Sequence, residues 1–233
     1  MYNVGIAFEI LGEGEKAPSG WSLVTGHIVW DVKMDLTRKA RWVLDGHKTY
    51  NLVGSTFAGV VSQESVRISF TYAALNGLNV FAAYIQNAYL GAPSSQRDYI
   101  ICGPEFGLEN VGKIALIHRA LYGGKAAGQD FRNHLRSCMR HINFSLCPAD
   151  PDVWMRPARH RNGCDCYEYC LLYVDDVLCI SENSESILRN ELGKYFELKN
   201  ESVGPPTLYL GAGMREVQLD NGSKAWPAVH HNM

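Results

Sequence analysis

The chain has 233 residues, of which 46% are hydrophobic and 20% are charged, enough for one large globular unit or two small ones. Its formal net charge of −2 excludes the strongly basic character that drives nonspecific nucleic-acid binding, so any such contact must come from local patches. No segment has the roughly 20 consecutive apolar residues of a membrane span or the layout of a secretory signal. Without a secretory signal, the seven cysteines favour free thiols in a reducing compartment. We therefore expect an intracellular protein, cytoplasmic or nuclear, that is neither secreted nor membrane-bound.

The first elements follow from local patterns. Residues 1–19 carry little pattern, which predicts an irregular lead-in. Apolar residues alternate over residues 24–34 and again over 36–44, which predicts a two-stranded hairpin. Ser62 is a residue type that begins helices and Gly77 is one that ends them, so a helix should lie between the two.

The remaining segments mix strands and helices. In chain order they are a strand at 80–85, a strand at 113–119, a helix at 125–141, a hairpin at 167–180, a helix at 184–196 and a strand at 208–217. Because these elements do not alternate regularly, the pattern predicts an α+β fold in which helices back an antiparallel sheet.

Two patterns leave alternatives open. The arginines within residues 156–161 predict a basic loop, which is either a solvated charge run or a contact for a phosphate backbone. Cys164, Cys166 and Cys170 with His160 suggest zinc, but their spacing lacks the paired C-x-x-C knuckles of structural zinc sites. Small thiols that pack on one face of a strand are the other interpretation.

The chemistry of the chain concentrates at Asp175 and Asp176, which interrupt an apolar stretch at residues 171–178. Two adjacent carboxylates repel each other and stay ionised only beside positive charge, and hard divalent cations such as Mg²⁺ prefer oxygen ligands of this kind. The alternative is an Asx turn that only closes a hairpin.

Eight segments in this order resemble the copia-type retrotransposon reverse transcriptases. They are TRKAR at 37–41, VVSQESVR at 60–67, NAYL at 87–90, GPEFG at 103–107, RALYG at 119–123, ADPDVW at 149–154, YVDD at 173–176 and YLGA at 209–212. The resemblance covers roughly residues 37–217. It implies the fingers and palm of a right-hand polymerase that copies an RNA or DNA template from a primer, with deoxynucleoside triphosphates as substrates.

The resemblance also implies a two-cation site, held in the family by three aspartates. Asp175 and Asp176 match two of them, and the backbone carbonyl of Ile85 matches a further ligand. At the position of the third aspartate this chain has Tyr84, a neutral phenol whose pKa is ordinarily about 10. We therefore expect weakened binding of Mg²⁺ or Mn²⁺ and impaired polymerase activity.

Other positions carry family roles by the same resemblance. Lys39 and Arg41 resemble cations that grip the triphosphate, and Tyr89 matches the aromatic under the incoming sugar, although a packed core tyrosine is the alternative. Two further sets complete the expected site: Tyr122 and Gly123 in the nucleotide pocket, and Tyr209, Leu210 and Gly211 in the primer grip.

The resemblance divides the chain into fingers at 20–59 and 92–126, palm at 60–91 and 127–217, and a tail at 218–233. Thumb and ribonuclease H segments are not expected within it, and another polypeptide could supply them. Two interpretations compete with an impaired enzyme: a noncatalytic nucleic-acid-binding or scaffolding module, and a decaying fragment of an element.

Overall fold

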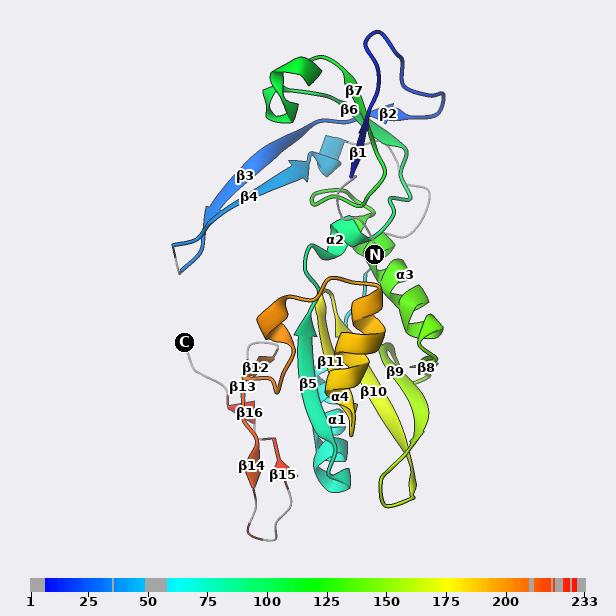
Figure 1. The fold of residues 1–233 in the computed structure, drawn as a ribbon, viewed down its shortest axis with the longest axis vertical. Helices are drawn as coiled ribbons and strands as arrows, with labels where there is room; N and C mark the ends of the chain where they lie inside the picture. Colours follow the sequence, from blue (N-terminus) through cyan, green and yellow to red (C-terminus); the bar gives the residue numbers. More distant parts are fainter. Residues whose placement is uncertain are drawn as a thin grey trace. The chain divides into compact units, whose positions relative to one another are not determined.

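The computed structural model describes residues 7–34, 36–48, 58–209, 212–218, 220, 224–226 and 228–229. It divides into two compact units (Figure 1). Unit 1 comprises Gly59–Gln86 and Arg136–Met233, and unit 2 comprises Tyr2–Ala58 and Asn87–Leu135. Each unit is therefore assembled from two separate stretches of the chain.

Unit 1 is built on a five-stranded antiparallel sheet in the order β5-β11-β10-β9-β8. Its strands are β5 (Asn79–Tyr84), β8 (Ser145–Cys147), β9 (Asp150–Arg159), β10 (Asp165–Tyr173) and β11 (Asp176–Ser181). The β10–β11 hairpin lies where the sequence predicts one. The predicted α+β class with an antiparallel sheet is confirmed.

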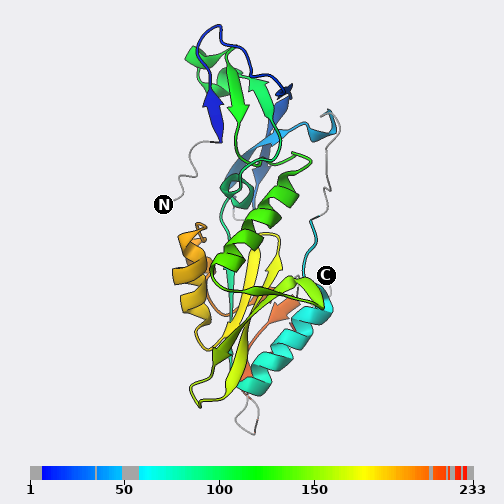
Figure 2. The same ribbon diagram turned by 90° about the vertical axis from the view of Figure 1, so that its right-hand side faces the viewer.

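Helix α1 (Gln63–Asn76) begins and ends at the predicted residues. The Ser62 hydroxyl accepts a hydrogen bond from the Ser65 backbone N–H at 3.1 Å, and Gly77 adopts a left-handed φ of 62° at the other end. Val66 and Phe70 are buried with Leu178 and Ile180 of the sheet in one apolar cluster. Burial of this helix face therefore holds α1 against one face of the sheet (Figure 2).

The opposite face of the sheet is covered by a helical segment at residues 184–194 (Figure 2). The sequence predicts one regular helix, but the structure has α4 (Ser184–Ser186), a π-helical turn η4 (Ile187–Glu191) and a 3₁₀ turn η5 (Leu192–Lys194). The backbone N–H of Leu192 bonds to the Ile187 carbonyl, five residues back, so the extra residue widens the turn. Ile187, Leu188 and Leu192 are nevertheless all buried.

The outer edge of β5 is covered by residues 197–204. Ala82 and Gly204 exchange two backbone hydrogen bonds of 2.7 and 3.1 Å. Further along, Lys199 donates its backbone N–H to the Tyr84 carbonyl at 3.0 Å, and the Ser202 hydroxyl accepts the Tyr84 N–H at 3.0 Å. Strand β5 is thus held by β11 on one side and by this segment on the other.

The predicted strand at 208–217 is wrong as a single element. β12 (Leu208–Tyr209) pairs antiparallel with β13 (Ala212–Met214), and Tyr209 lies opposite Ala212, so the chain reverses between them. Leu210 and Gly211 lie outside the described residues. The remaining short strands are β14 (Val217–Gln218), β15 (Lys224–Ala225) and β16 (Ala228–Val229).

The predicted basic loop is mostly strand β9. Arg156 lies within the sheet, opposite Glu168 of β10, and its guanidinium pairs with Glu168 and Glu191 at 2.6 Å each. The Arg156 side chain therefore forms ion pairs within unit 1 and is not part of a solvated charge run. The other two arginines of the set are exposed: Arg159 at the end of β9, and Arg161, whose side chain is 82% exposed.

Unit 2 contains a four-stranded sheet in the order β1-β7-β6-β2 and a separate hairpin. The sheet strands are β1 (Phe8–Ile10), β2 (Ser22–Leu23), β6 (Asp98–Ile101) and β7 (Ile114–Ile117), and the hairpin strands are β3 (Gly26–Val32) and β4 (Arg38–Leu44). Only β7 and the hairpin are predicted from the sequence. Helix α2 (Ala88–Gly91) and the first half of α3 (Ala127–His141) complete the unit with the 3₁₀ turns η1 (Gly46–Lys48), η2 (Pro104–Phe106) and η3 (Leu108–Asn110).

No helix in the described part of the chain combines the length and apolarity that crossing a membrane requires. All seven cysteines are free thiols.

Candidate active site

The acidic pair lies at the turn between β10 and β11. Tyr173 and Asp176 are register partners, so Val174 and Asp175 form a two-residue connection. Val174 has φ of 53°, a left-handed conformation that a β-branched residue adopts only when its surroundings enforce it. Positive φ at the first central residue is the geometry of the primed hairpin turns, whose twist matches that of the strands.

Strand β5 brings Tyr84 to the acidic turn. Tyr84 is the register partner of Asp176, and the backbone N–H of Ile85 donates to the Asp175 carbonyl at 2.8 Å. Directly opposed residues in an antiparallel pair point to the same face of the sheet. Position 84 and the two aspartates, which the family resemblance assigns to one site, therefore lie on neighbouring strands, although 91 residues separate Tyr84 from Asp176 in the chain.

Burial makes the acidic pair costly when it is ionised. The half-buried position of Asp176 raises the pKa of its carboxyl, and the neighbouring charge of Asp175 raises it further. A carboxylate in this environment is stabilised either by a proton or by a cation. The described residues contain no group of three or more His, Cys, Asp or Glu side chains placed to share a metal ion. The site therefore offers the carboxylates of Asp175 and Asp176 and, on the neighbouring strand, the phenol of Tyr84.

Tyr209 lies close to this pair from a different element, β12. Its side chain is 5% exposed and belongs to the same apolar cluster as Leu178. Burial raises the pKa of Tyr209 well above its usual value, and the charge of Asp176 adds to the effect. Among the described residues, its hydroxyl has no hydrogen-bond partner. The family resemblance places Tyr209 in a primer grip. It did not predict that the Tyr209 side chain is buried close to Asp176.

Ile85 is 1% exposed, so its side chain belongs to the core, as expected for a position that contributes only backbone to a site.

The zinc candidates do not converge. Cys170 is buried opposite Cys179 in the sheet, whereas Cys164 is exposed. The ring of His160 is engaged by the Asn76 carbonyl at 3.1 Å.

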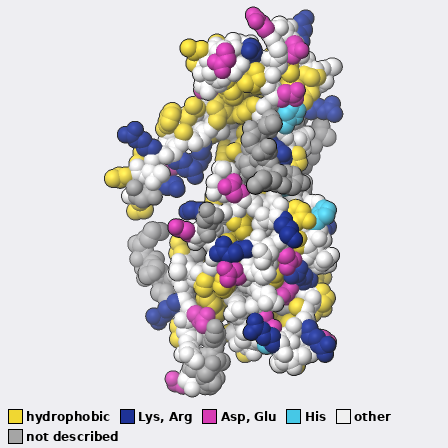
Figure 3. Space-filling model, in the orientation of Figure 1, with side chains coloured by type: hydrophobic (Ala, Val, Ile, Leu, Met, Phe, Trp, Pro, Cys, Tyr) yellow, Lys and Arg dark blue, Asp and Glu magenta, His cyan; other side chains and the backbone are white. Residues whose placement is uncertain are grey.

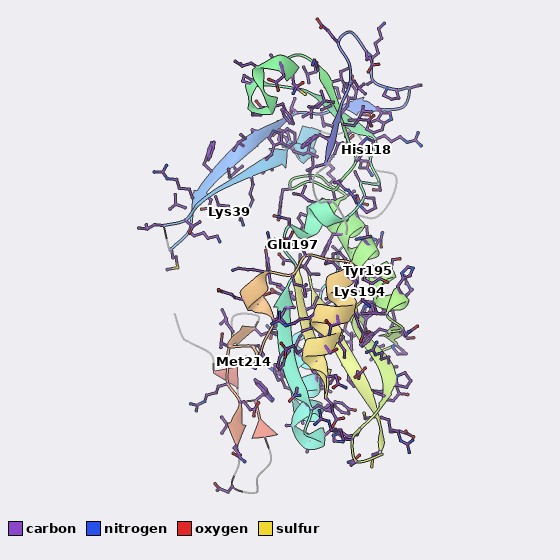
Figure 4. All side chains as sticks on the ribbon, in the orientation of Figure 1. Lys39, His118, Lys194, Tyr195, Glu197 and Met214 are labelled. Atoms are coloured by element: carbon purple, nitrogen blue, oxygen red, sulfur yellow. The ribbon has the colours of Figure 1, made fainter. Side chains whose placement is uncertain are left out.

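In unit 2, Lys39 and Arg41 lie two residues apart on β4 and share one face of the hairpin. Figure 4 labels Lys39 on this strand. Asp31 is the register partner of Lys39, and its carboxylate lies 3.5 Å from the Arg41 guanidinium. Both side chains are half-buried, so this face of the hairpin is not fully solvated.

Tyr89 and Tyr122 also come together in unit 2. Their ring centroids are 4.9 Å apart in an edge-to-face arrangement, and the Phe131 ring is 6.1 Å from Tyr89. Gly123 has φ of 79°, and a Cβ there would lie 2.1 Å from the Leu44 carbonyl oxygen. Only glycine allows this turn to approach the end of β4.

A cavity of about 310 Å³ in unit 2 is lined by Arg97, Arg119 and Lys125 among other residues. Lys39, Arg41, Tyr89 and Tyr122 do not line it, so it is separate from the positions that the sequence assigns to the nucleotide.

Comparison with known proteins shows the family of the chain. A model of the family Reverse transcriptase (RNA-dependent DNA polymerase) matches residues 15–224. No curated protein matches the chain. Since the match spans most of the 233 residues, the chain belongs to the reverse transcriptase (RNA-dependent DNA polymerase) family.

Proposed function

We propose that this chain is the fingers and palm of a copia-type reverse transcriptase whose DNA synthesis is impaired at one side chain. The observation that carries the proposal is the pairing of Tyr84 with Asp176, which puts a phenol where the family resemblance calls for a carboxylate. Unit 1, which contains the acidic turn, would be the palm. Unit 2, with the β3–β4 hairpin, would be the fingers.

Asp175, Asp176 and the carbonyl of Ile85 would hold a divalent cation such as Mg²⁺ or Mn²⁺. Burial beside a second carboxylate supports this, because both raise the pKa of Asp176 and a cation close by would offset this cost of ionisation. When bound, the ions supply charge that stabilises the phosphoryl groups during transfer. The donor set fits one cation better than two, since it lacks a third carboxylate among the described residues.

Tyr84 explains the expected loss of activity. A neutral phenol offers one weakly basic oxygen on a rigid ring, whereas a carboxylate offers a full negative charge. Catalysis of phosphoryl transfer is mainly electrostatic, and removing a single preorganised stabilising group costs about 10²–10³ in rate in other enzymes. We expect a loss of at least this size for a charged ligand.

The other candidate residues would bind the substrates. Arg41 would have to exchange its contact with Asp31 for the triphosphate, while Lys39 provides a second charge on the same face. Tyr89 and Tyr122 would form the wall of the nucleotide pocket, with Gly123 holding its turn. Because the side chain of Tyr209 is buried, a primer grip at Tyr209, Leu210 and Gly211 would contact the primer through other atoms of this hairpin.

Primer extension on an RNA template with Mg²⁺ or Mn²⁺ tests the proposal. We expect little product from the unaltered chain and increased product from Tyr84→Asp. The matched control is Tyr84→Asp combined with Asp176→Asn, which should abolish the gain because it removes a neighbouring ligand. Rapid synthesis by the unaltered chain would contradict the proposal.

A noncatalytic nucleic-acid-binding module is the second candidate. It is favoured by the intact β3–β4 hairpin, where Lys39 and Arg41 are kept while the acidic site has lost a ligand. Binding of primer-template that weakens as salt rises, together with no extension even by Tyr84→Asp, would select this alternative.

A further inference from the structure

Two buried cysteines face each other in the hairpin that carries the acidic turn. Cys170 of β10 and Cys179 of β11 are register partners, and they are 1% and 0% exposed. On the other side of its strand, Cys170 lies opposite Trp154 of β9, and Cys179 lies opposite Phe81 of β5. Within the registers of these four strands, the sulfur that faces either thiol is therefore that of the other cysteine.

The hydrogen-bond pattern of the hairpin decides how closely the two cysteines approach. A two-residue turn is closed by a hydrogen bond between its flanking residues, so Tyr173 and Asp176 form a hydrogen-bonded pair. The neighbouring ladder agrees, because the Ile85 N–H donates to the Asp175 carbonyl, which leaves the backbone groups of Asp176 for β10. Hydrogen-bonded and non-hydrogen-bonded pairs alternate along the ladder. The two cysteines, three steps from the turn, are thus a non-hydrogen-bonded pair, the closer kind, with Cα atoms about 4.5 Å apart.

This spacing suits a disulfide, which joins Cα atoms about 4.4–6.8 Å apart. Directly opposed residues also point to the same face of the sheet, so the two sulfurs lie side by side. They already interact, because hydrogen bonding to the Cys179 thiol, followed by burial, raises the pKa of Cys170 well above its ordinary value. A bond between them therefore needs little movement of either strand.

The folded sheet protects this pair from solvent. Leu171 and Leu178 belong to the apolar cluster on the α1 side, so Cys170 and Cys179 point to the opposite face, which the helical segment at residues 184–194 covers. Figure 3 shows charged side chains of both signs on the outer surface of unit 1 where this segment lies. A buried thiol with a raised pKa reacts slowly, so an oxidant reaches the pair when the segment lifts from the sheet.

We propose that Cys170 and Cys179 are a modification site, a dithiol that a peroxide converts into a disulfide across the acidic hairpin. One sulfur attacks a peroxide oxygen, the O–O bond breaks, and a sulfenic acid and one water form. The second sulfur then attacks the sulfenic sulfur, the S–O bond breaks, and the oxygen leaves as a second water. Two thiols and one hydrogen peroxide give one disulfide and two waters, so the sulfurs are oxidised and the peroxide is reduced.

The disulfide closes a ring over residues 170–179, which contain the acidic turn. It ties β10 to β11 and removes open conformations from the unfolded chain, so the oxidised protein is the more stable form. The site consists of the chain's own thiols, and it holds whether or not the chain synthesises DNA.

The test uses the folded full chain without metal or nucleic acid. Iodoacetamide first caps the accessible thiols, and hydrogen peroxide is then added. Digestion at Glu168 and Asp176 separates Cys170 from both Cys166 and Cys179, so the disulfide appears as two joined peptides. We expect this joined pair as the main product, in protein that still runs as a monomer on a non-reducing gel.

Two variants and one physical measurement accompany the test. Cys179→Ala should give no joined peptides. Cys138→Ala, which removes another buried thiol, at 3% exposure, is the matched control and should give as much joined product as the unaltered chain. Oxidation of the unaltered chain should raise the midpoint of thermal unfolding by about 4 °C or more, and dithiothreitol should reverse the shift.

The proposal is overturned if peroxide yields no joined peptides, or yields them only after the chain is unfolded in urea. Capping of Cys170 and Cys179 as fast as the exposed Cys164 would also overturn it, because the pair would then not be protected. A disulfide that lowers the midpoint would show that the bond strains the hairpin, with the same conclusion. None of these results depends on the polymerase test at position 84.

Discussion

The guanidinium of Arg156 grips the carboxylate of Glu191 with two hydrogen bonds, of 2.6 and 2.9 Å. It also donates to Glu168 at 2.6 Å and to the Ile142 carbonyl at 2.8 Å, and it lies 4.5 Å above the Phe144 ring. The pKa of Arg156 is raised, first by its bonds to Glu191, although burial opposes this. One side chain thus joins β9, β10 and the helical segment at residues 184–194.

We therefore expect Arg156→Ala to destabilise the fold by about 3–5 kcal/mol, because it leaves the buried Glu168 without its cation. Arg156→Lys should recover only part of this loss, since an ammonium cannot match the two-pronged geometry. Urea unfolding measures both. Arg67→Ala, on the exposed side of α1, is the control, and a loss at Arg156 no larger than at Arg67 would contradict the assignment.

Asp150 should make stability depend on acid pH. Burial alone would raise the pKa of its carboxyl, but hydrogen bonds from Ser65, Asp152 and Ser62 outweigh burial and leave the pKa below the usual value. A carboxyl with a lowered folded-state pKa stabilises the fold above the unfolded pKa, about 3.9, and this contribution is lost as pH falls through the folded value.

The unaltered chain should therefore be more stable than Asp150→Asn at pH 7, and the difference should shrink below about pH 4. Urea unfolding across this range checks it. A difference that stays constant between pH 7 and pH 3 would show that the charge of Asp150 is not involved.

Gly123→Ala should be strongly destabilising. Besides its φ of 79°, the new Cβ would lie 2.1 Å from the Leu44 carbonyl oxygen, so the turn would have to move away from β4. Gly163→Ala is a matched control, because Gly163 has φ of 86° with no atom within 4 Å of the added Cβ. We expect the control to lose about 1–2 kcal/mol from backbone strain alone and Gly123→Ala to lose clearly more. Equal losses in thermal unfolding would contradict this.

Tyr84→Asp should make stability depend on divalent cations. Without metal, a third carboxylate beside Asp175 and Asp176 adds repulsion, so the variant should unfold at a lower temperature than the unaltered chain in EDTA. Mn²⁺ should then stabilise the variant more, by about 2.7 kcal/mol at 100 times its dissociation constant. Tyr84→Phe, which removes only the hydroxyl, is the control. An equal response to Mn²⁺ in all three proteins would refute the idea that position 84 limits metal binding.

Local signals predicted the parts of the fold that depend on near neighbours. Ser62 and Gly77 mark the ends of α1, and alternation marks the β3–β4 hairpin. Apolar residues on both sides of Asp175 and Asp176 mark the β10–β11 hairpin. Strand β9 was missed because its arginines and prolines resemble a loop. Pro157 is tolerated because the pairing with β8 ends at Met155, so the side of Pro157 away from β10 faces no strand.

The site depends on contacts that no local pattern encodes. The pairing of β5 with β11 joins Tyr84 to Asp176, and only the resemblance to a family suggested it before the structure was known. The burial of Tyr209 also arises from a distant segment that folds onto the same cluster. Likewise, the regular helix predicted at 184–196 becomes a π-turn, because burying Ile187, Leu188 and Leu192 outweighs ideal helical geometry.

The hydrogen bonds between β5 and residues 197–204 fix which residue of β5 lies beside the acidic turn. A strand bonded along both edges cannot slide by a residue without breaking both ladders and turning its interior side chains outward. No neighbouring residue of β5 can therefore shift into position 84. By the same constraint, the backbone at position 84 is already fixed opposite Asp176, so a carboxylate introduced by Tyr84→Asp would lie beside the acidic turn without a change of strand register.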